Sequence, residues 1–220
     1  MNKTSFRTIV PALLLATTLV ALGQQPATGL RTFTFERDAV GARPSGFEFA
    51  RTGGGAEGKW VVEADKEEPS NRVLAQTSAD PTDNRFPLAV VKEGTYKDVT
   101  LTVRTRPVSG DVDQGFGLVW RYRDANNYYI TRCNADEDNC TIYHVVKGSR
   151  RSFQNKSATV TKNKWHTLKL EAKGDHFIVT FDGQKVLDAT DETFKEAGKV
   201  GLWTKADSVI QFDDLVIEGH

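Results

Sequence analysis

Short segments in which apolar and polar residues alternate follow one another from residue 60 onward, separated by turn residues. This alternation, without helical periodicity between the segments, is typical of a chain built from β-strands. We expect strands at residues 60–64, 72–77, 88–92, 99–106, 115–122, 128–134, 141–147, 165–172, 176–181, 185–188, 200–204 and 209–218. A single helical turn is expected around residues 192–197.

Turn signals join these predicted strands into hairpins. Asp182-Gly183 is a two-residue turn of the Asp-Gly type that hairpins favour, and Gly174-Asp175 marks another turn just before it. Many short strands linked in this way predict an all-β fold, namely a two-sheet antiparallel sandwich. Because the strand pattern resumes directly after the glycine-rich segment 53–58, we expect one domain.

The first residues of the chain have the layout of a secretory signal peptide. Lys3 and Arg7 precede an apolar run at residues 9–22 that ends in small residues. The run is shorter than the ~20 residues needed to span a bilayer. We expect a signal peptide over residues 1–23, a single mature domain over residues 24–220 without a membrane span, and a secreted or periplasmic location. A retained membrane anchor is the alternative.

Charge and composition exclude several classes of protein. The chain has 29 Lys and Arg against 29 Asp and Glu, and loss of Lys3 and Arg7 would leave 27 against 29, a net charge of −2. A nucleic-acid partner is not expected, because sequence-independent binders carry an excess of cations. A hydrophobic fraction of 39% with 10% aromatic residues excludes a disordered chain and a disulfide-dense miniprotein.

The two cysteines flank a polar, turn-rich segment. If the hairpin is centred on Asp136-Glu137, Cys133 lies directly opposite Cys140, at a separation that a disulfide can bridge. This pairing fits an extracytoplasmic protein. Two buried free thiols and a metal-binding pair are the alternatives, although a metal site would need more soft ligands than four histidines supply.

Two apparent catalytic motifs lack the context that they require. Residues 53–58 match the Gly-x-Gly-x-x-Gly pattern of dinucleotide-binding sites, but a predicted strand follows where a helix is needed. Residues 63–68 match the Glu-x-Asp-x-x-Glu spacing of family 16 glycoside hydrolases, but charged residues interleave the acids and a turn follows. We therefore expect neither motif to be a catalytic site.

The two faces of the hairpins in residues 115–147 differ in chemistry. With turns near Asp124-Ala125 and Asp136-Glu137, alternation divides the side chains into two sets. The uncharged set, expected to be buried, is Phe116, Leu118, Trp120, Tyr122, Tyr129, Thr131, Cys133, Cys140, Ile142 and His144. The other set is Gly117, Val119, Arg121, Tyr128, Ile130, Arg132, Thr141, Tyr143 and Val145. Its two arginines predict that this face meets water or a ligand.

The face that carries the arginines has the side chains that sugar recognition needs. Aromatic rings stack on the C–H faces of a sugar ring, and guanidinium groups donate hydrogen bonds to hydroxyls or a carboxylate. The candidate binding residues of this face are Arg121, Tyr128, Arg132 and Tyr143, and Gly117 would leave room for a ring. Trp203 either extends this surface or fills the core. A solvated outer face without a ligand is the alternative reading.

Several short motifs of this chain occur together in one known family. They are Gly-Leu-Val-Trp-Arg-Tyr at 117–122, Asn-Tyr-Tyr at 127–129, Tyr-His-Val-Val-Lys-Gly at 143–148, Trp-His-Thr-Leu at 165–168, Gly-Lys-Val-Gly-Leu-Trp-Thr at 198–204 and Phe-Asp-Asp-Leu at 212–215. Over roughly residues 30–218 the chain resembles concanavalin A-like lectin/glucanase jelly rolls of the laminin-G type, most closely bacterial 3-keto-disaccharide hydrolase domains. The resemblance implies a two-sheet antiparallel jelly roll whose concave face binds or cleaves glycans.

The resemblance also bears on metal binding and catalysis. Many relatives hold a structural Ca²⁺ between the first and last strands, and oxygen ligands suit this ion. The residues so implied are Glu36, Asp38, Asp213 and Asp214, with solvated strand-end acids as the alternative. No other cofactor is expected. The hydrolase group has an Asn-Ser-Gly stretch before the arginine, whereas this chain has Gly115-Phe116-Gly117.

Together these observations favour a secreted, monomeric carbohydrate-binding domain, similar to a lectin, that recognises a glycan. The missing catalytic motifs favour binding over catalysis. One alternative is a glycoside hydrolase that acts on 3-keto-disaccharides or related glycans, with acids from the loops 111–113 or 136–138. A structural or adhesion module is the third reading.

Overall fold

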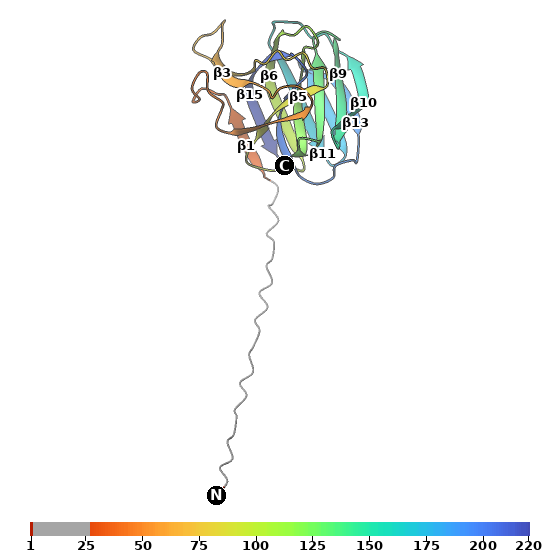
Figure 1. Ribbon diagram of the computed structural model, residues 1–220. Helices are drawn as coiled ribbons and strands as arrows, with labels where there is room; N and C mark the ends of the chain where they lie inside the picture. The colour runs from red at the N-terminus through yellow and green to blue at the C-terminus, as the bar shows by residue number, and fades with distance from the viewer. Residues whose placement is uncertain (2–26) are drawn as a thin grey trace.

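Two antiparallel β-sheets packed face to face form the protein (Figure 1). The computed structural model describes Met1 and residues 27–220, so the predicted signal peptide lies outside the described residues apart from Met1. Within residues 27–220 there is no helix, and thus none that could cross a membrane. The strands are β1 (Gly29–Phe33), β2 (Phe47–Gly53), β3 (Trp60–Ala64), β4 (Arg72–Gln76), β5 (Arg85–Val91), β6 (Val99–Ser109), β7 (Gly115–Asp124), β8 (Asn127–Asn134), β9 (Asn139–Val146), β10 (Ser149–Ser157), β11 (His166–Lys173), β12 (His176–Phe181), β13 (Gln184–Thr190), β14 (Lys199–Thr204) and β15 (Val209–Gly219).

Both sheets pair strands that are far apart in the sequence. One sheet has the order β13-β12-β11-β6-β15-β4-β3, with β1 also paired to β15, and the other has the order β10-β9-β8-β7-β14-β5-β2. The late strands β14 and β15 are thus inserted between earlier strands, one in each sheet, as the crossovers of a jelly roll require. The predicted all-β, two-sheet antiparallel jelly roll is confirmed.

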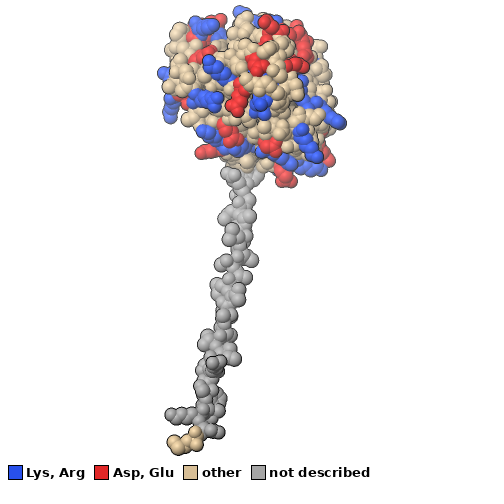
Figure 2. All heavy atoms as spheres, in the orientation of Figure 1, with Lys and Arg blue, Asp and Glu red and all other residues tan. Residues whose placement is uncertain are grey.

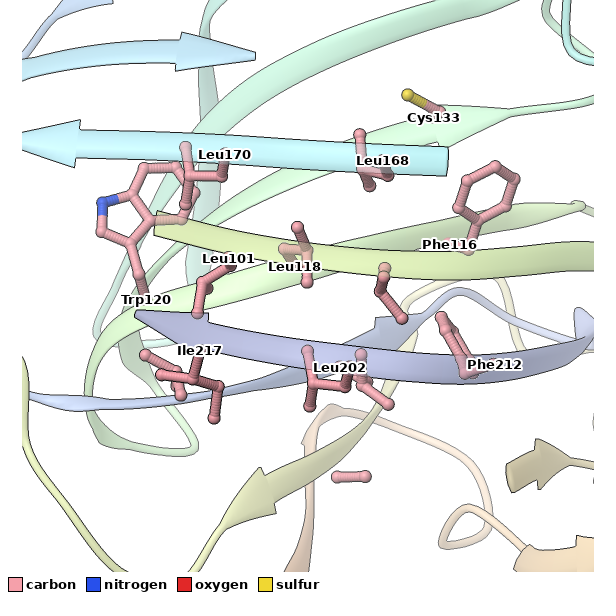
Figure 3. Packing of buried hydrophobic residues seen from close by; sticks show 14 of the residues in the cluster. Leu101, Phe116, Leu118, Trp120, Cys133, Leu168, Leu170, Leu202, Phe212 and Ile217 are labelled. Atoms are coloured by element: carbon pink, nitrogen blue, oxygen red, sulfur yellow. The ribbon is translucent and has the colours of Figure 1, made fainter. Parts of the chain in front are cut away.

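Apolar side chains from the facing sides of the two sheets form one continuous core. Figure 3 shows Leu118 and Trp120 of β7 with Leu202 of β14, packed near Leu170 of β11 and Phe212 of β15. These side chains are completely buried. Removing each from water stabilises the fold by about 1.5–3 kcal/mol before the entropy of ordering is counted.

The structure corrects three features of the sequence-based expectation. Strands β1, β2 and β10 were not predicted, because all three contain charged residues and β1 and β10 have few buried positions. The helical turn expected at residues 192–197 is wrong, since this segment is irregular. Its Phe194 is buried, and the Phe194 backbone N–H donates to the Tyr129 hydroxyl rather than to a helical carbonyl.

The predicted disulfide between Cys133 and Cys140 is confirmed. The two residues are directly paired between β8 and β9, and both side chains are buried in the core. The bond closes the end of the β8–β9 hairpin. It therefore holds a turn whose Glu137 and Asn139 side chains bind Arg132 on the opposite, outer face of the sheet.

Candidate functional site

The seven-stranded sheet carries a second apolar cluster on the face that is turned away from the core. We call it the outer cluster, and it consists of Phe86, Leu88, Val90, Val119, Tyr122, Tyr128, Ile130, Val145 and Trp203. Small aliphatic residues of the central strands leave space for the aromatic rings above them. Phe86 and Trp203 stack with their ring centroids 5.4 Å apart. Such a cluster is a preformed apolar floor.

Arg150 of β10 covers this floor. Its guanidinium carbon lies 4.6 Å from the ring centroid of Phe86, 4.5 Å from that of Tyr143 and 5.6 Å from that of Trp203. These distances are in the range of cation–π interactions. Among the described residues no carboxylate forms an ion pair with Arg150, and its buried Nη1 has no hydrogen-bond partner. Burial lowers the pKa of Arg150, as expected for a cation that loses water without gaining a counterion.

A polar pocket opens beside Arg150. It has a volume of about 370 Å³ and lies between the start of β10, the start of β5 and Lys205. This volume is within the roughly 300–1,000 Å³ that is typical of small-molecule sites. Lys205 Nζ lies 2.6 Å from Asp83 Oδ1 and 2.7 Å from Asp113 Oδ2, so one ammonium group holds two carboxylates at the rim.

Arg132 lies on the same face and is held by the turn that the disulfide closes. Its Nη2 is 2.7 Å from Glu137 Oε2, its Nη1 is 3.1 Å from Glu137 Oε1, and Nη2 also donates to Asn139 Oδ1 at 2.6 Å. The hydrogen bonds from Arg132 lower the pKa of Glu137 to about 2. Burial alone would lower the pKa of Arg132, but Glu137 raises it overall. Both terminal nitrogens of this arginine are therefore paired, unlike those of Arg150, although its buried Nε has no hydrogen-bond partner.

Asp113 is a buried carboxylate next to this pair. Burial raises its pKa, although Lys205 and Arg132 act in the opposite direction. Asn134 Nδ2 donates to Asp113 Oδ1 at 3.1 Å. The Asp207 carboxylate fixes the loop, because it accepts hydrogen bonds from the backbone N–H groups of residues 111, 112 and 113 at 2.7, 3.1 and 3.1 Å. Asp113 and Glu137 thus have opposite pKa shifts. They lie in the loops 111–113 and 136–138, which the sequence analysis named as possible sources of catalytic acids.

Four of the five predicted ligand-binding residues lie on this outer face. They are Tyr128, Arg132, Tyr143 and Trp203. Tyr128 and Trp203 are completely buried within the floor, and Tyr143 is half-buried at its edge. The Tyr128 hydroxyl lies 2.8 Å from Thr52 Oγ1 of β2, so this tyrosine ties the floor together rather than facing solvent.

The fifth residue, Arg121, lies elsewhere, and its predicted position was wrong. The pairing of β7 with β8 shifts register between Trp120 and Asp124, and Arg121 has a positive φ of 47°. This bulge moves Tyr122 to the outer face and sends Arg121 over the Phe177 ring of the core. There the guanidinium donates to the backbone carbonyls of Lys97, Phe194 and Gly174. Arg121 therefore holds three loops together.

Gly117 also has a different role from the predicted one. A Cβ atom at this position would lie 2.0 Å from the backbone oxygen of Thr131 on the neighbouring strand. The glycine thus permits close approach of β7 and β8, and the space above it is bordered by its paired residues Arg132 and Trp203. It does not provide an open place for a sugar ring.

The acids implied as calcium ligands do not form such a site. Glu36 accepts from the Arg72 backbone N–H at 2.9 Å, whereas Asp213 accepts from Asn71 Nδ2 at 2.9 Å. The remaining two acids also accept hydrogen bonds from protein groups. Asp38 accepts from the backbone N–H of Ser45, and Asp214 accepts from the guanidinium of Arg104. In the described part of the chain no three His, Cys, Asp or Glu side chains are grouped as metal ligands. These residues therefore do not fit a bound Ca²⁺.

The sequence analysis missed the residues that surround the pocket. Arg150 lies on β10, which was not predicted as a strand, and Phe86 immediately precedes a predicted one. Lys205 follows β14, and Asp83 lies in the loop before β5. Alternation beyond residue 147 could have pointed to Arg150, since Arg150 pairs with Val145 and so shares its face.

Comparison with known proteins agrees with this fold. The carbohydrate-binding module CBM66 from Bacillus subtilis superposes with a TM-score of 0.60 at 22% identity, covering 78% of this chain and 95% of the module. A GH43 protein, BlXynB from Bacillus licheniformis, has a TM-score of 0.56 at 15% identity, covering 86% of this chain and 39% of that protein.

Two sequence matches extend the comparison. A levanase from Bacillus subtilis is 32% identical over 80 residues, which are 36% of this chain, and the chain spans only 12% of the length of that enzyme. Residues 41–218 match the family model of the 3-keto-alpha-glucoside-1,2-lyase-like domain. Since this match covers most of the chain, the protein belongs to the 3-keto-alpha-glucoside-1,2-lyase-like domain family.

Proposed function

We propose that this protein is an extracytoplasmic carbohydrate-binding domain whose glycan site is the outer face of the seven-stranded sheet around Arg150. The observation that carries the proposal is a guanidinium group that lies over three aromatic rings without a protein counterion, at the rim of a pocket. A site of this kind offers guanidinium donors and, beside them, the half-buried ring of Tyr143. Both are needed to bind a sugar, which has hydroxyls along its edge and C–H groups on its faces.

The polar groups of the pocket suit sugar hydroxyls. Arg150 and Lys205 present N–H donors, and Asp83, with 75% of its side chain exposed, presents acceptor oxygens. A hydroxyl both donates and accepts, so donors and acceptors side by side satisfy it. Tyr143 is half-buried and presents the edge of the aromatic cluster next to Arg150.

The comparisons support a carbohydrate ligand. The family is described as lyase-like toward 3-keto-α-glucosides, and a structural neighbour is a carbohydrate-binding module. We further propose that residues 1–23 direct the chain out of the cytoplasm as a signal peptide and that it acts as a monomer. The disulfide supports this location, because such bonds persist in oxidising compartments.

A glycan array probed with residues 24–220 tests the proposal. We expect binding that Arg150→Met weakens by more than about 10-fold, since the guanidinium provides the central donors. Arg151→Met is the matched control, because Arg151 is the next residue of β10, is exposed and pairs with His144 instead. Failure of the folded wild-type protein to bind any glycan would overturn the proposal.

A second candidate function is cleavage of a 3-keto-glycoside at this same face. The observation that favours it is the pair of opposite pKa shifts, raised at Asp113 and lowered at Glu137. As a carboxylate, Asp113 would take the proton from the carbon next to the keto group, and the electrons of that C–H bond would form a C=C bond as the glycosidic C–O bond breaks. Asp113 would then return the proton to the departing glycosidic oxygen. Glu137 stays ionised and holds Arg132.

Sugar release from 3-keto-disaccharides separates catalysis from binding. If the protein is an enzyme, the wild type releases the sugar. Asp113→Asn should then lower the rate by at least about 100-fold, which is the typical contribution of a proton-transfer group. Asp111→Asn is the control in the same loop, because only the backbone N–H of Asp111 is engaged by Asp207. Binding without release by the wild-type protein would exclude this second function.

A further inference from the structure

We infer that the sugar bound at this site carries an anionic group, a carboxylate or a sulfate, and that Arg150 is its partner. The inference rests on the proposed glycan-binding function and names the class of glycan. Its basis is the distribution of charge around the pocket, in which one cation is left without a counterion.

Three cations and three carboxylates concern us at and beside the pocket, namely Arg150, Lys205, Arg132, Asp83, Asp113 and Glu137. Lys205 pairs with Asp83 and Asp113, and Arg132 pairs with Glu137. All three carboxylates are therefore held at 2.6–2.7 Å by a cation other than Arg150. The six charges balance in number, but among the described residues Arg150 has no carboxylate within ion-pair distance.

Burial makes this unpaired charge costly. Aromatic rings of Phe86, Tyr143 and Trp203 take the place of water around the guanidinium, and its Nη1 is buried without a hydrogen-bond partner. An unpaired ion in such surroundings loses hydration that only a counterion or strong acceptors restore. An incoming anion would compensate for the lost hydration of the guanidinium. A neutral hydroxyl would accept a hydrogen bond from one N–H group but would not neutralise the positive charge.

The shape of the group matches a carboxylate or a sulfate ester. A guanidinium is a planar fork that binds two oxygens of one anion side by side. The same fork is already occupied at Arg132, where Glu137 takes both nitrogens. Arg132 thus shows, within this protein, how one carboxylate occupies two N–H groups of a guanidinium. At Arg150 a ligand would meet Nε and Nη2, because Nη1 is buried.

Calorimetric titration with matched sugars tests the inference. The probes are α-1,4-digalacturonate, α-1,4-galactobiose as its neutral counterpart, and a galactobiose 6-sulfate. We expect one or both anionic sugars to bind about 10-fold or more tightly than the neutral one, with the difference shrinking between ~0.05 and ~0.5 M NaCl as the charges are screened. Comparison of the first and third probes distinguishes a carboxylate from a sulfate.

Two substitutions test whether Arg150 binds an anion or only packs against the aromatic rings. Arg150→Lys keeps the charge but loses the fork, so we expect it to remove most of the preference for the anion while the protein stays folded. Asp83→Asn removes an exposed negative charge close to Arg150, and we expect the ratio of the anionic-sugar affinity to the neutral-sugar affinity to rise about 2-fold. Arg151→Met again serves as the control.

The outcomes distinguish the inference from the function on which it rests. If neutral and anionic sugars bind equally and Arg150→Met weakens both, glycan binding stands and the anionic preference is overturned. If a broad array of neutral and anionic glycans shows no binding to the folded protein, the proposed function fails and the inference fails with it.

Discussion

Arg132 and Glu137 form a two-fold ion pair across the turn of the β8–β9 hairpin, with Nη2–Oε2 and Nη1–Oε1 distances of 2.7 and 3.1 Å. Next to Arg132 on β8, Cys133 is bonded to Cys140 of β9 on the inner face of the same hairpin. The hairpin is thus held covalently on the core side and by an ion pair on the outer side. The outer pair contributes to the candidate site, and the inner bond fixes the turn that carries it.

Glu137 makes stability depend on pH. Its pKa falls from 4.5 to about 2 in the folded protein, so its contribution is present above pH 4.5 and is lost as the pH falls through 2. The shift alone corresponds to about 3 kcal/mol. Because 46% of the side chain is exposed, solvent screening reduces this to about 1 kcal/mol. Urea unfolding of wild type and Glu137→Gln should differ by that amount near pH 7 and converge near pH 2. A constant difference over this range would contradict the assignment.

The disulfide should stabilise the protein by restricting its unfolded state. A loop closed between Cys133 and Cys140, seven residues apart, corresponds to about 2–3 kcal/mol in the chain-entropy model. We expect the double variant Cys133→Ala/Cys140→Ala to lose this amount in chemical denaturation. Binding of the preferred glycan should weaken as well, because the turn that presents Glu137 to Arg132 becomes mobile. Unchanged stability would show that the hairpin needs no covalent link.

Arg121 and Arg150 should differ sharply in their effect on stability. Arg121→Met removes hydrogen bonds to the carbonyl oxygens of Lys97, Phe194 and Gly174, of which that of Phe194 stays buried without a donor, and we expect a loss of about 2–5 kcal/mol. Arg150→Met removes a guanidinium that has no protein partner among the described residues, and the change should stay within about 1 kcal/mol. Equal losses in thermal unfolding would reverse our assignment of structural and ligand-binding roles.

Gly117 should tolerate no side chain. An alanine Cβ would lie 2.0 Å from the backbone oxygen of Thr131, so the two strands would have to separate, and we expect a loss of about 1–3 kcal/mol or more. Gly183→Ala is the comparison, because its Cβ would meet no atom within 4 Å and only its positive φ of 78° opposes the change. Its cost should be about 1 kcal/mol. Calorimetric melting temperatures measure both, and a milder effect at Gly117 would disagree with the close approach of β7 and β8.

Charge distribution explains why composition alone was a poor guide to the site. The protein is neutral overall, and Figure 2 shows Lys and Arg interspersed with Asp and Glu over the visible face. Net charge argued against a nucleic-acid partner but could not reveal an individual cation without a partner. Whether Arg150 is paired depends on where Asp83, Asp113 and Glu137 lie in space, and each of these acids comes from a different loop.

The sequence by itself determined the strands other than β1, β2 and β10, together with the Asp182-Gly183 hairpin and the disulfide, because alternation and turn residues act over a few neighbouring positions. It also placed Tyr128, Arg132 and Tyr143 on one face, since each strand presents every second residue to the same side. Only the tertiary structure decided which strands became neighbours, and thereby brought Phe86 of β5 and Trp203 of β14 beneath Arg150 of β10. It also introduced the bulge at Arg121, because the pairing of two strands sets a register that the pattern of one strand does not contain.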